Sequence, residues 1–132
     1  MSMPIYRGLV TVAALATMLA ACGREPDNQA LANVEAEQVR DAADDGRIFC
    51  ALGGAEAFRL DCTMDRMASA DGTVLVLGKA DVGYRRFRIA TDGRGVVAAD
   101  GAETASVQIV ENGLIEVTVA QDRYRLPATV RQ

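Results

Sequence analysis

Apolar and polar positions alternate in short runs from residue 47 onward, which is the pattern of half-buried antiparallel strands. The clearest run covers residues 58–65, where Cys62 and its apolar neighbours share one face while charged and hydroxyl side chains share the other. Turn signals such as Asp-Gly separate the runs, and Asn112-Gly113 favours a type I′ hairpin turn. The pattern predicts an all-β fold: an antiparallel meander of about seven or eight short strands that closes into a small barrel or sandwich.

The stretch before residue 47 has a helical composition and an acidic charge. Residues 29–43 are mostly good helix formers, and Asp27 or Asn28 suits the N-cap position. Their apolar stripe is thin, and an isolated helix of this length is marginal in water. Residues 22–46 contain two arginines and seven carboxylates, whereas residues 47–132 carry equal numbers of both signs. We therefore expect residues 22–46 to be an acidic, partly helical tether that holds a neutral β domain, residues 47–132, clear of a membrane.

Residues 1–21 have the layout of a bacterial signal peptide, with a signal helix and Arg7 as the only charge. Residues 8–20 are uncharged but shorter than the roughly 20 helical residues that span a bilayer core. The sequence Leu19-Ala20-Ala21-Cys22 resembles the lipobox of bacterial lipoproteins. This resemblance implies cleavage before Cys22 and attachment of a lipid anchor to its side chain. The alternatives are an ordinary secretory signal cleaved nearby and a retained membrane helix, which the short apolar run disfavours.

The lipobox resemblance implies a bacterial envelope protein that is lipid-anchored and faces the periplasm. Gly23 stands where an aspartate favours inner-membrane retention in many Gram-negative lipoproteins, so we expect the outer membrane more than the inner one. The periplasm is oxidising, and Cys50 and Cys62 fall on the apolar faces of neighbouring expected strands. We expect a disulfide between them, which would contribute about 3 kcal/mol by restricting the unfolded chain. The alternative is a pair of free, buried thiols.

Candidate catalytic chemistry is sparse. The chain has no histidine, which removes the commonest general base and the commonest metal ligand. The Asp-Gly pairs lack the spacing of a calcium-binding loop, and turn chemistry explains them. The sequence has no block of basic residues that would favour nucleic-acid binding. We predict a non-catalytic domain with no cofactor and no metal site.

A basic segment in the middle of the domain is the nearest feature to a ligand site. Alternation places Tyr84, Arg86 and Arg88 on one face of an expected strand. That face could bind an anionic group, such as a lipid phosphate or a glycan carboxylate, or an envelope protein. Equally, it could be a solvated face whose arginines pair across strands with the aspartates of residues 58–65. The segment Arg-Tyr-Arg at residues 123–125 offers the same two interpretations.

The β domain also has resemblances to known families. Residues 92–103 and 122–128 in particular resemble small, uncharacterised lipoproteins of alphaproteobacteria, which implies no known activity. The expected architecture is similar to that of the membrane-bound c-type lysozyme inhibitors, but this sequence lacks their Ser-Gly-x-x-Tyr loop, so no inhibitory residue is transferred. We expect a membrane-anchored periplasmic lipoprotein whose β domain is a structural or interaction module of the cell envelope. The alternative is an inhibitor of lysozyme or of another hydrolase.

Overall fold

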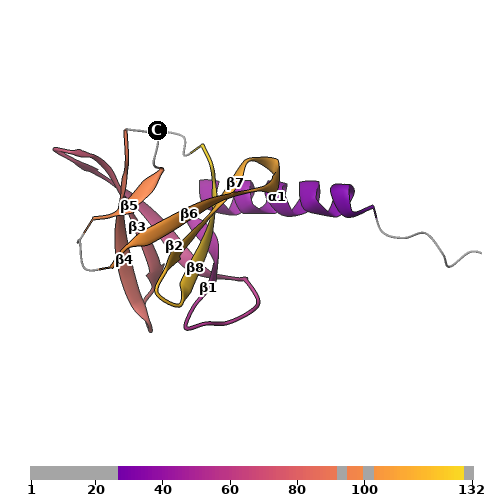
Figure 1. Cartoon of the computed structure of the whole chain (residues 1–132), viewed down its shortest axis with the longest axis horizontal. Helices are drawn as coiled ribbons and strands as arrows, with labels where there is room; N and C mark the ends of the chain where they lie inside the picture. The colour runs from indigo at the N-terminus through magenta and orange to yellow at the C-terminus, as the bar shows by residue number, and fades with distance from the viewer. Residues whose placement is uncertain (1–26, 92–94, 100–102, 130–132) are drawn as a thin grey trace, which may run out of the picture.

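The computed structural model describes residues 27–91, 95–99 and 103–129, in which one α-helix precedes eight β-strands (Figure 1). The helix is α1 (Asn28–Asp44), and the strands are β1 (Arg47–Ala51), β2 (Arg59–Ser69), β3 (Gly72–Lys79), β4 (Gly83–Ile89), β5 (Val96–Ala98), β6 (Ala105–Val110), β7 (Leu114–Val119) and β8 (Asp122–Pro127). A single 3-10 turn, η1 (Glu111–Gly113), joins β6 to β7. The expected signal peptide and Cys22 lie outside the described residues. No helix in the described ranges is long and apolar enough to cross a membrane.

The eight strands form one antiparallel sheet that curls into a nearly closed barrel (Figure 1). Strands adjacent in sequence pair with each other from β1 to β5 and from β6 to β8, and the pairing of β1 with β8 joins the two groups. At the two ends of the sheet, β5 and β6 approach each other. The predicted all-β meander is therefore confirmed, and its form is a barrel.

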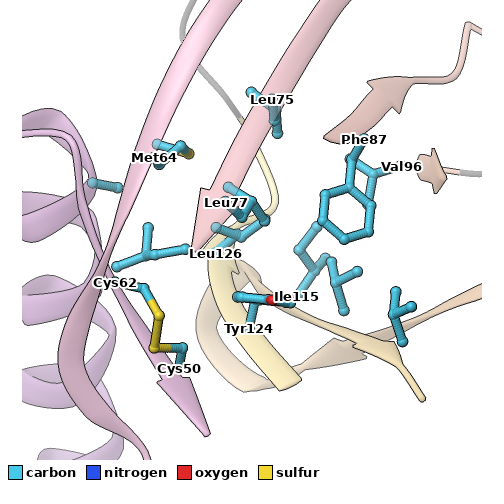
Figure 2. Close-up of a cluster of buried hydrophobic side chains, with 14 residues drawn as sticks. Cys50, Cys62, Met64, Leu75, Leu77, Phe87, Val96, Ile115, Tyr124 and Leu126 are labelled. Atoms are coloured by element: carbon cyan, nitrogen blue, oxygen red, sulfur yellow. A yellow bond between two sulfur atoms is a disulfide. The ribbon is translucent and has the colours of Figure 1, made fainter. Parts of the chain in front are cut away.

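Apolar side chains that alternate inward along the strands fill the barrel interior. The largest that are fully buried are Tyr124, Phe87, Ile48, Leu75, Leu77 and Leu126. Phe87 and Tyr124 meet edge to face, with their ring centroids 5.9 Å apart (Figure 2). This contact joins β4 to β8, which are not neighbours in the sheet, and such aromatic pairs contribute about 0.5–1.5 kcal/mol beyond their burial.

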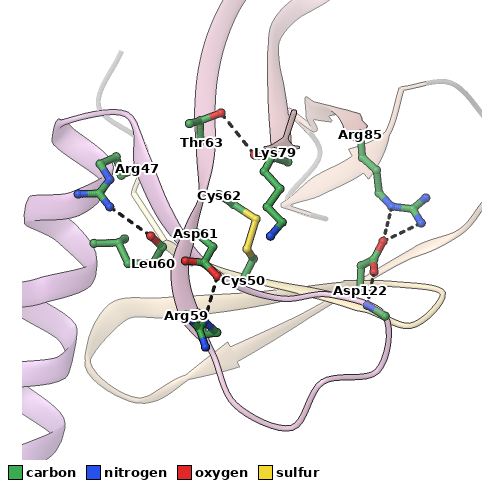
Figure 3. Close-up of a disulfide and its surroundings, with 12 residues drawn as sticks. Arg47, Cys50, Arg59, Leu60, Asp61, Cys62, Thr63, Lys79, Arg85 and Asp122 are labelled. Atoms are coloured by element: carbon green, nitrogen blue, oxygen red, sulfur yellow. Dashed lines mark hydrogen bonds and ion pairs between the residues drawn. A yellow bond between two sulfur atoms is a disulfide. The ribbon is translucent and has the colours of Figure 1, made fainter. Parts of the chain in front are cut away.

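A disulfide between Cys50 and Cys62 connects β1 to β2, with the two Cα atoms 6.0 Å apart (Figure 3). The register pairs Ile48 with Cys62 but Cys50 with Arg59, so a β-bulge lies between the two pairs. Both cysteines are buried in the core. The expected bond is therefore present, and it fastens both ends of the β1–β2 loop to the barrel.

The β6–β7 hairpin differs by one residue from its prediction. Val110 pairs with Leu114, so the connection is the three-residue turn η1. Asn112 and Gly113 have φ angles of 60° and 73°, the positive values that a type I′ turn also requires. Asn-Gly thus marks the turn correctly, and Glu111 lengthens it.

The acidic stretch before the barrel is a regular helix that docks on it. The Asp27 carboxylate caps α1 by accepting a backbone N–H of the first turn at 3.1 Å. Ala36 and Val39 are buried against Leu114 on the outside of the barrel, and Ala43 joins the main core. The predicted helix is confirmed, but the half of α1 that contains these residues packs against the barrel, as a free tether would not. These tertiary contacts supply the stability that an isolated acidic helix lacks.

Candidate functional site

Strand β4 places the three predicted site residues on the outside of the barrel. Phe87 points into the core and is only 1% exposed. Side chains alternate along a strand, so Tyr84, Arg86 and Arg88 face outward. The barrel fold thus brings an aromatic ring and two guanidinium groups onto one surface.

The antiparallel register aligns this surface in three rows across β2, β3 and β4. The rows are Thr63 with Gly78 and Tyr84, Asp65 with Val76 and Arg86, and Met67 with Val74 and Arg88. Tyr84 and Met67 are 51% and 48% exposed, so large apolar groups flank the arginines. We name as the β4 face the surface formed by Tyr84, Arg86, Arg88, Val76 and Met67. Tyrosine, methionine and arginine are the residue types that protein interfaces favour.

Gly78 sets the close approach of β3 and β4 at the Tyr84 end of the β4 face. Its φ angle is 151°, and a Cβ at this position would collide with the carbonyl oxygen of Gly83. A larger residue would push the two strands apart, because backbone atoms leave no room for a side chain. The glycine therefore allows the two strands to pair closely where Gly78 lies opposite Tyr84.

The cross-strand ion pairs that the sequence allowed do not form between the described residues. Asp61 pairs with Arg59 on the same strand, with Nε and Oδ2 3.0 Å apart. Asp65 lies in the same row as Arg86 but two strands away, and no ion pair within the described ranges joins it to Arg86 or Arg88. The outer side of β4 therefore carries two guanidinium groups that have no ion-pair partner among the described residues.

Arg85 belongs to the inner side of β4 and closes one end of the barrel. Its Nη2 and Nε donate to Asp122 Oδ2 at 2.9 and 3.0 Å (Figure 3). It also pairs with Glu103. Asp122 accepts a further hydrogen bond from the Gly53 backbone N–H at 2.8 Å. Nearby, burial raises the pKa of the Tyr124 hydroxyl, and the negative charge of Asp122 raises it further. This arrangement ties the β1–β2 loop, β4 and β8 together and is structural.

The second basic segment lies on the outside of β8 and is covered. The ring of Phe58, from the β1–β2 loop, packs against both guanidinium groups, 4.8 Å from Arg123 and 4.1 Å from Arg125. Arg123 donates to two carbonyl oxygens of the same loop at 2.9 and 3.0 Å. Arg125 pairs with Glu116 on β7, 3.4 Å away, and with Glu35 on α1. These arginines therefore hold the loop and the helix to the barrel.

Sequence reasoning missed that α1 is part of this assembly. Its buried residues Ala36, Val39 and Ala43 have the i, i+3, i+7 spacing of a docking face, but two of them are alanines, which give little hydrophobic signal. Arg40 donates to the carbonyl oxygen of Asn112 at the η1 turn, which adds a second polar contact. Two shallow grooves of about 340 and 200 Å³ flank the helix. Within the described part of the chain, no cluster of three or more acidic or cysteine side chains could hold a metal ion.

Comparisons of this chain with protein-family models, with curated proteins and with solved structures found no match. The resemblance to bacterial lipoproteins therefore stays a prediction from residues 1–22.

Proposed function

We propose that this chain is a lipid-anchored protein of the bacterial envelope, whose barrel is a non-catalytic binding module facing the periplasm. The β4 face is its contact surface, and the partner is an envelope protein or glycan that carries anionic groups. The lipobox-like sequence that ends at Cys22 supports the anchor. The outer membrane is the favoured location, because Gly23 follows that cysteine.

One observation carries the binding role: alternation along β4 and the register set Tyr84, Arg86 and Arg88 together on the outside of the barrel, beside Val76 on β3 and in the same rows as Met67 on β2. A guanidinium group can bind a carboxylate or phosphate through two parallel hydrogen bonds. An exposed tyrosine supplies contact area at little entropic cost, and a methionine side chain can adapt to the shape of a partner. Apolar side chains fill the barrel interior, so this outer surface is the natural place for a ligand.

Photo-cross-linking in cells tests the β4 face. The full chain, with its signal segment, would carry benzoylphenylalanine in place of Tyr84, and the matched control would carry it in place of the exposed Gln108 on β6. We expect a discrete adduct from position 84 that is absent from position 108. Adding Arg86→Ala and Arg88→Ala should abolish it, since each charged hydrogen-bonded contact is worth about 1.5–3 kcal/mol.

Equal adducts at both positions, or an adduct that survives the loss of both arginines, would overturn the assignment of the β4 face.

The anchor is tested separately with Cys22→Ser. We expect this variant to leave the membrane fraction without any change in its melting temperature. A processed Cys22→Ser protein that still sediments with membranes would refute lipid anchorage.

A further inference from the structure

We propose that two exposed apolar residues of α1, Leu31 and Val34, rest on the surface of the membrane, among lipids with net-neutral headgroups. The inference rests on the proposed lipid anchor at Cys22 and deepens it. It assigns α1 a role as a strut that lies against the bilayer and sets the position of the barrel.

The N-terminal half of α1 projects beyond the barrel (Figure 1). Leu31 is 57% exposed and Val34 is 53% exposed, whereas the buried residues of the helix all follow them in sequence. Helical periodicity places Val34 on the side opposite the buried stripe, with Leu31 beside it. An apolar pair on a projecting, solvent-facing side of a helix is available to an external surface.

The length of chain before the helix brings this pair close to the membrane. Five residue steps separate Cys22 from the N-cap Asp27, and whatever their conformation they span at most about 18 Å. Leu31 and Val34 lie only about 6 and 10 Å further along the helix axis, at 1.5 Å per residue. A lipid on Cys22 would therefore hold both residues within reach of the headgroup layer.

Docking fixes the direction in which the pair points. Val39 is buried against the barrel, Glu35 pairs with Arg125, and Arg40 donates to the Asn112 carbonyl oxygen. These contacts stop α1 from turning about its own axis relative to the barrel. The side that carries Leu31 and Val34 can thus meet the bilayer while the barrel stays in water.

The charges of α1 select the kind of surface. All the charged side chains of α1 follow Val34 in sequence. They are one arginine, Arg40, and four carboxylates, those of Glu35, Glu37, Asp41 and Asp44. Anionic headgroups would repel this helix, and so would the same acidic helix of a second copy. Net-neutral lipids such as phosphatidylethanolamine remain as the surface that fits.

Tryptophan fluorescence of the lipidated full chain tests the contact, because the sequence contains no tryptophan. Leu31→Trp would report from the proposed contact, and Ile109→Trp, at an 85% exposed apolar position on β6, is the matched control. In vesicles of neutral lipids that include brominated chains, we expect at least about twofold quenching at position 31, as for a side chain ~5–10 Å deep in the headgroup boundary. We expect no quenching at position 109, and less at position 31 as phosphatidylglycerol is added.

The outcomes separate the contact from the anchor. Protein that floats with the vesicles while Leu31→Trp stays unquenched would overturn the contact and leave the anchor standing. A blue-shifted but unquenched Leu31→Trp would also overturn it, because the side chain would then be buried against protein. Lipidated protein that does not float at all would refute the anchor and the contact together. Both substituted positions are exposed, so an unchanged melting temperature should show that the variants fold.

Discussion

The barrel contains the same tripeptide pattern twice, and the two copies have opposite surroundings. Arg86-Phe87-Arg88 lies on β4, and Arg123-Tyr124-Arg125 lies on β8. In both, the central aromatic side chain points inward and the two rings touch inside the core. On β8, the β1–β2 loop and α1 cover the arginines, whereas on β4 Arg86 and the neighbouring Tyr84 are exposed and Arg88 is half-buried.

The difference shows that a strand pattern specifies which side chains face out but not what covers them. Coverage of β8 follows from the sheet order, which sets β8 beside β1 and therefore beside the loop that carries Phe58. It also follows from α1, whose Glu35 reaches Arg125. Within the described residues, β4 has β3 and β5 as neighbours, and its outward arginines belong to the β4 face, which we propose as the contact surface.

The largest expected effect tests the feature that the two segments share. Phe87→Ala and Tyr124→Ala should each lower the free energy of unfolding by about 3–5 kcal/mol, because each removes a fully buried aromatic ring. Denaturant unfolding of the purified domain gives the values, with Tyr84→Ala as the exposed control at less than about 0.5 kcal/mol. A small loss for only one of the buried pair would show that the two segments do not share one core.

Removing the disulfide should leave the arginines of β8 less covered and therefore more like those of β4. The double variant Cys50→Ser with Cys62→Ser should lose about 3 kcal/mol of stability. Because the bond fastens both ends of the loop that holds Phe58, the stacking of Phe58 on Arg125 should weaken as well. Arg125→Ala should then be less costly in the disulfide-free background than in the native one. Urea unfolding measures the loss of unfolding free energy in both backgrounds. Equal losses would show that the packing of Phe58 on Arg125 does not depend on the disulfide.

Local features of the fold follow from the sequence. Inward alternation at Phe87 and at Cys62 depends only on neighbouring residues in a strand, and the Asn112-Gly113 turn depends on two residues that tolerate positive φ. The alternation and the place of the turn are predicted correctly, whereas the turn is one residue longer than predicted. The disulfide was also predictable, since the lipobox resemblance implies an oxidising compartment and sets Cys22 aside, and the two other cysteines allow a single pairing.

Contacts between distant segments do not follow from the sequence. Arg125 and Glu35 are 90 residues apart, and nothing in the local pattern of either indicates the other. The docking stripe of α1 depends on Ala36 and Ala43, whose small side chains suit close packing but leave the helix looking like a solvated tether. The β4 face is predictable only in part. Alternation along one strand predicts Tyr84 and the two arginines, whereas Met67 joins them only through the register of β2.

A smaller effect should distinguish the arginines of the two segments. Arg125→Ala should cost about 1–2 kcal/mol, because it removes one of the two arginines that pair with Glu116 and loosens α1, although Glu35 is exposed enough for solvent to weaken its share. Arg88→Ala should change stability by less than about 0.5 kcal/mol and act on partner binding instead. Urea unfolding together with the cross-linking yield measures both properties. An Arg88→Ala loss as large as that of Arg125→Ala would show that β4 is covered too.

The smallest expected effect is a pH dependence of stability that Tyr124 contributes and Phe87 does not. Burial raises the pKa of the Tyr124 hydroxyl above its ordinary value of 10.0, and its counterpart Phe87 has no proton to lose. The unfolded chain can ionise its tyrosine more easily than the barrel can, so Tyr124 favours folding below pH 10 and loses that contribution as the pH rises through its raised pKa. Stability measured by urea unfolding should therefore fall more steeply above pH 10 in the native chain than in Tyr124→Phe. Parallel curves for the two proteins would mean that the hydroxyl can ionise inside the barrel. The end of β8 at Asp122 would then open to solvent more readily than the Arg85–Asp122 hydrogen bonds suggest.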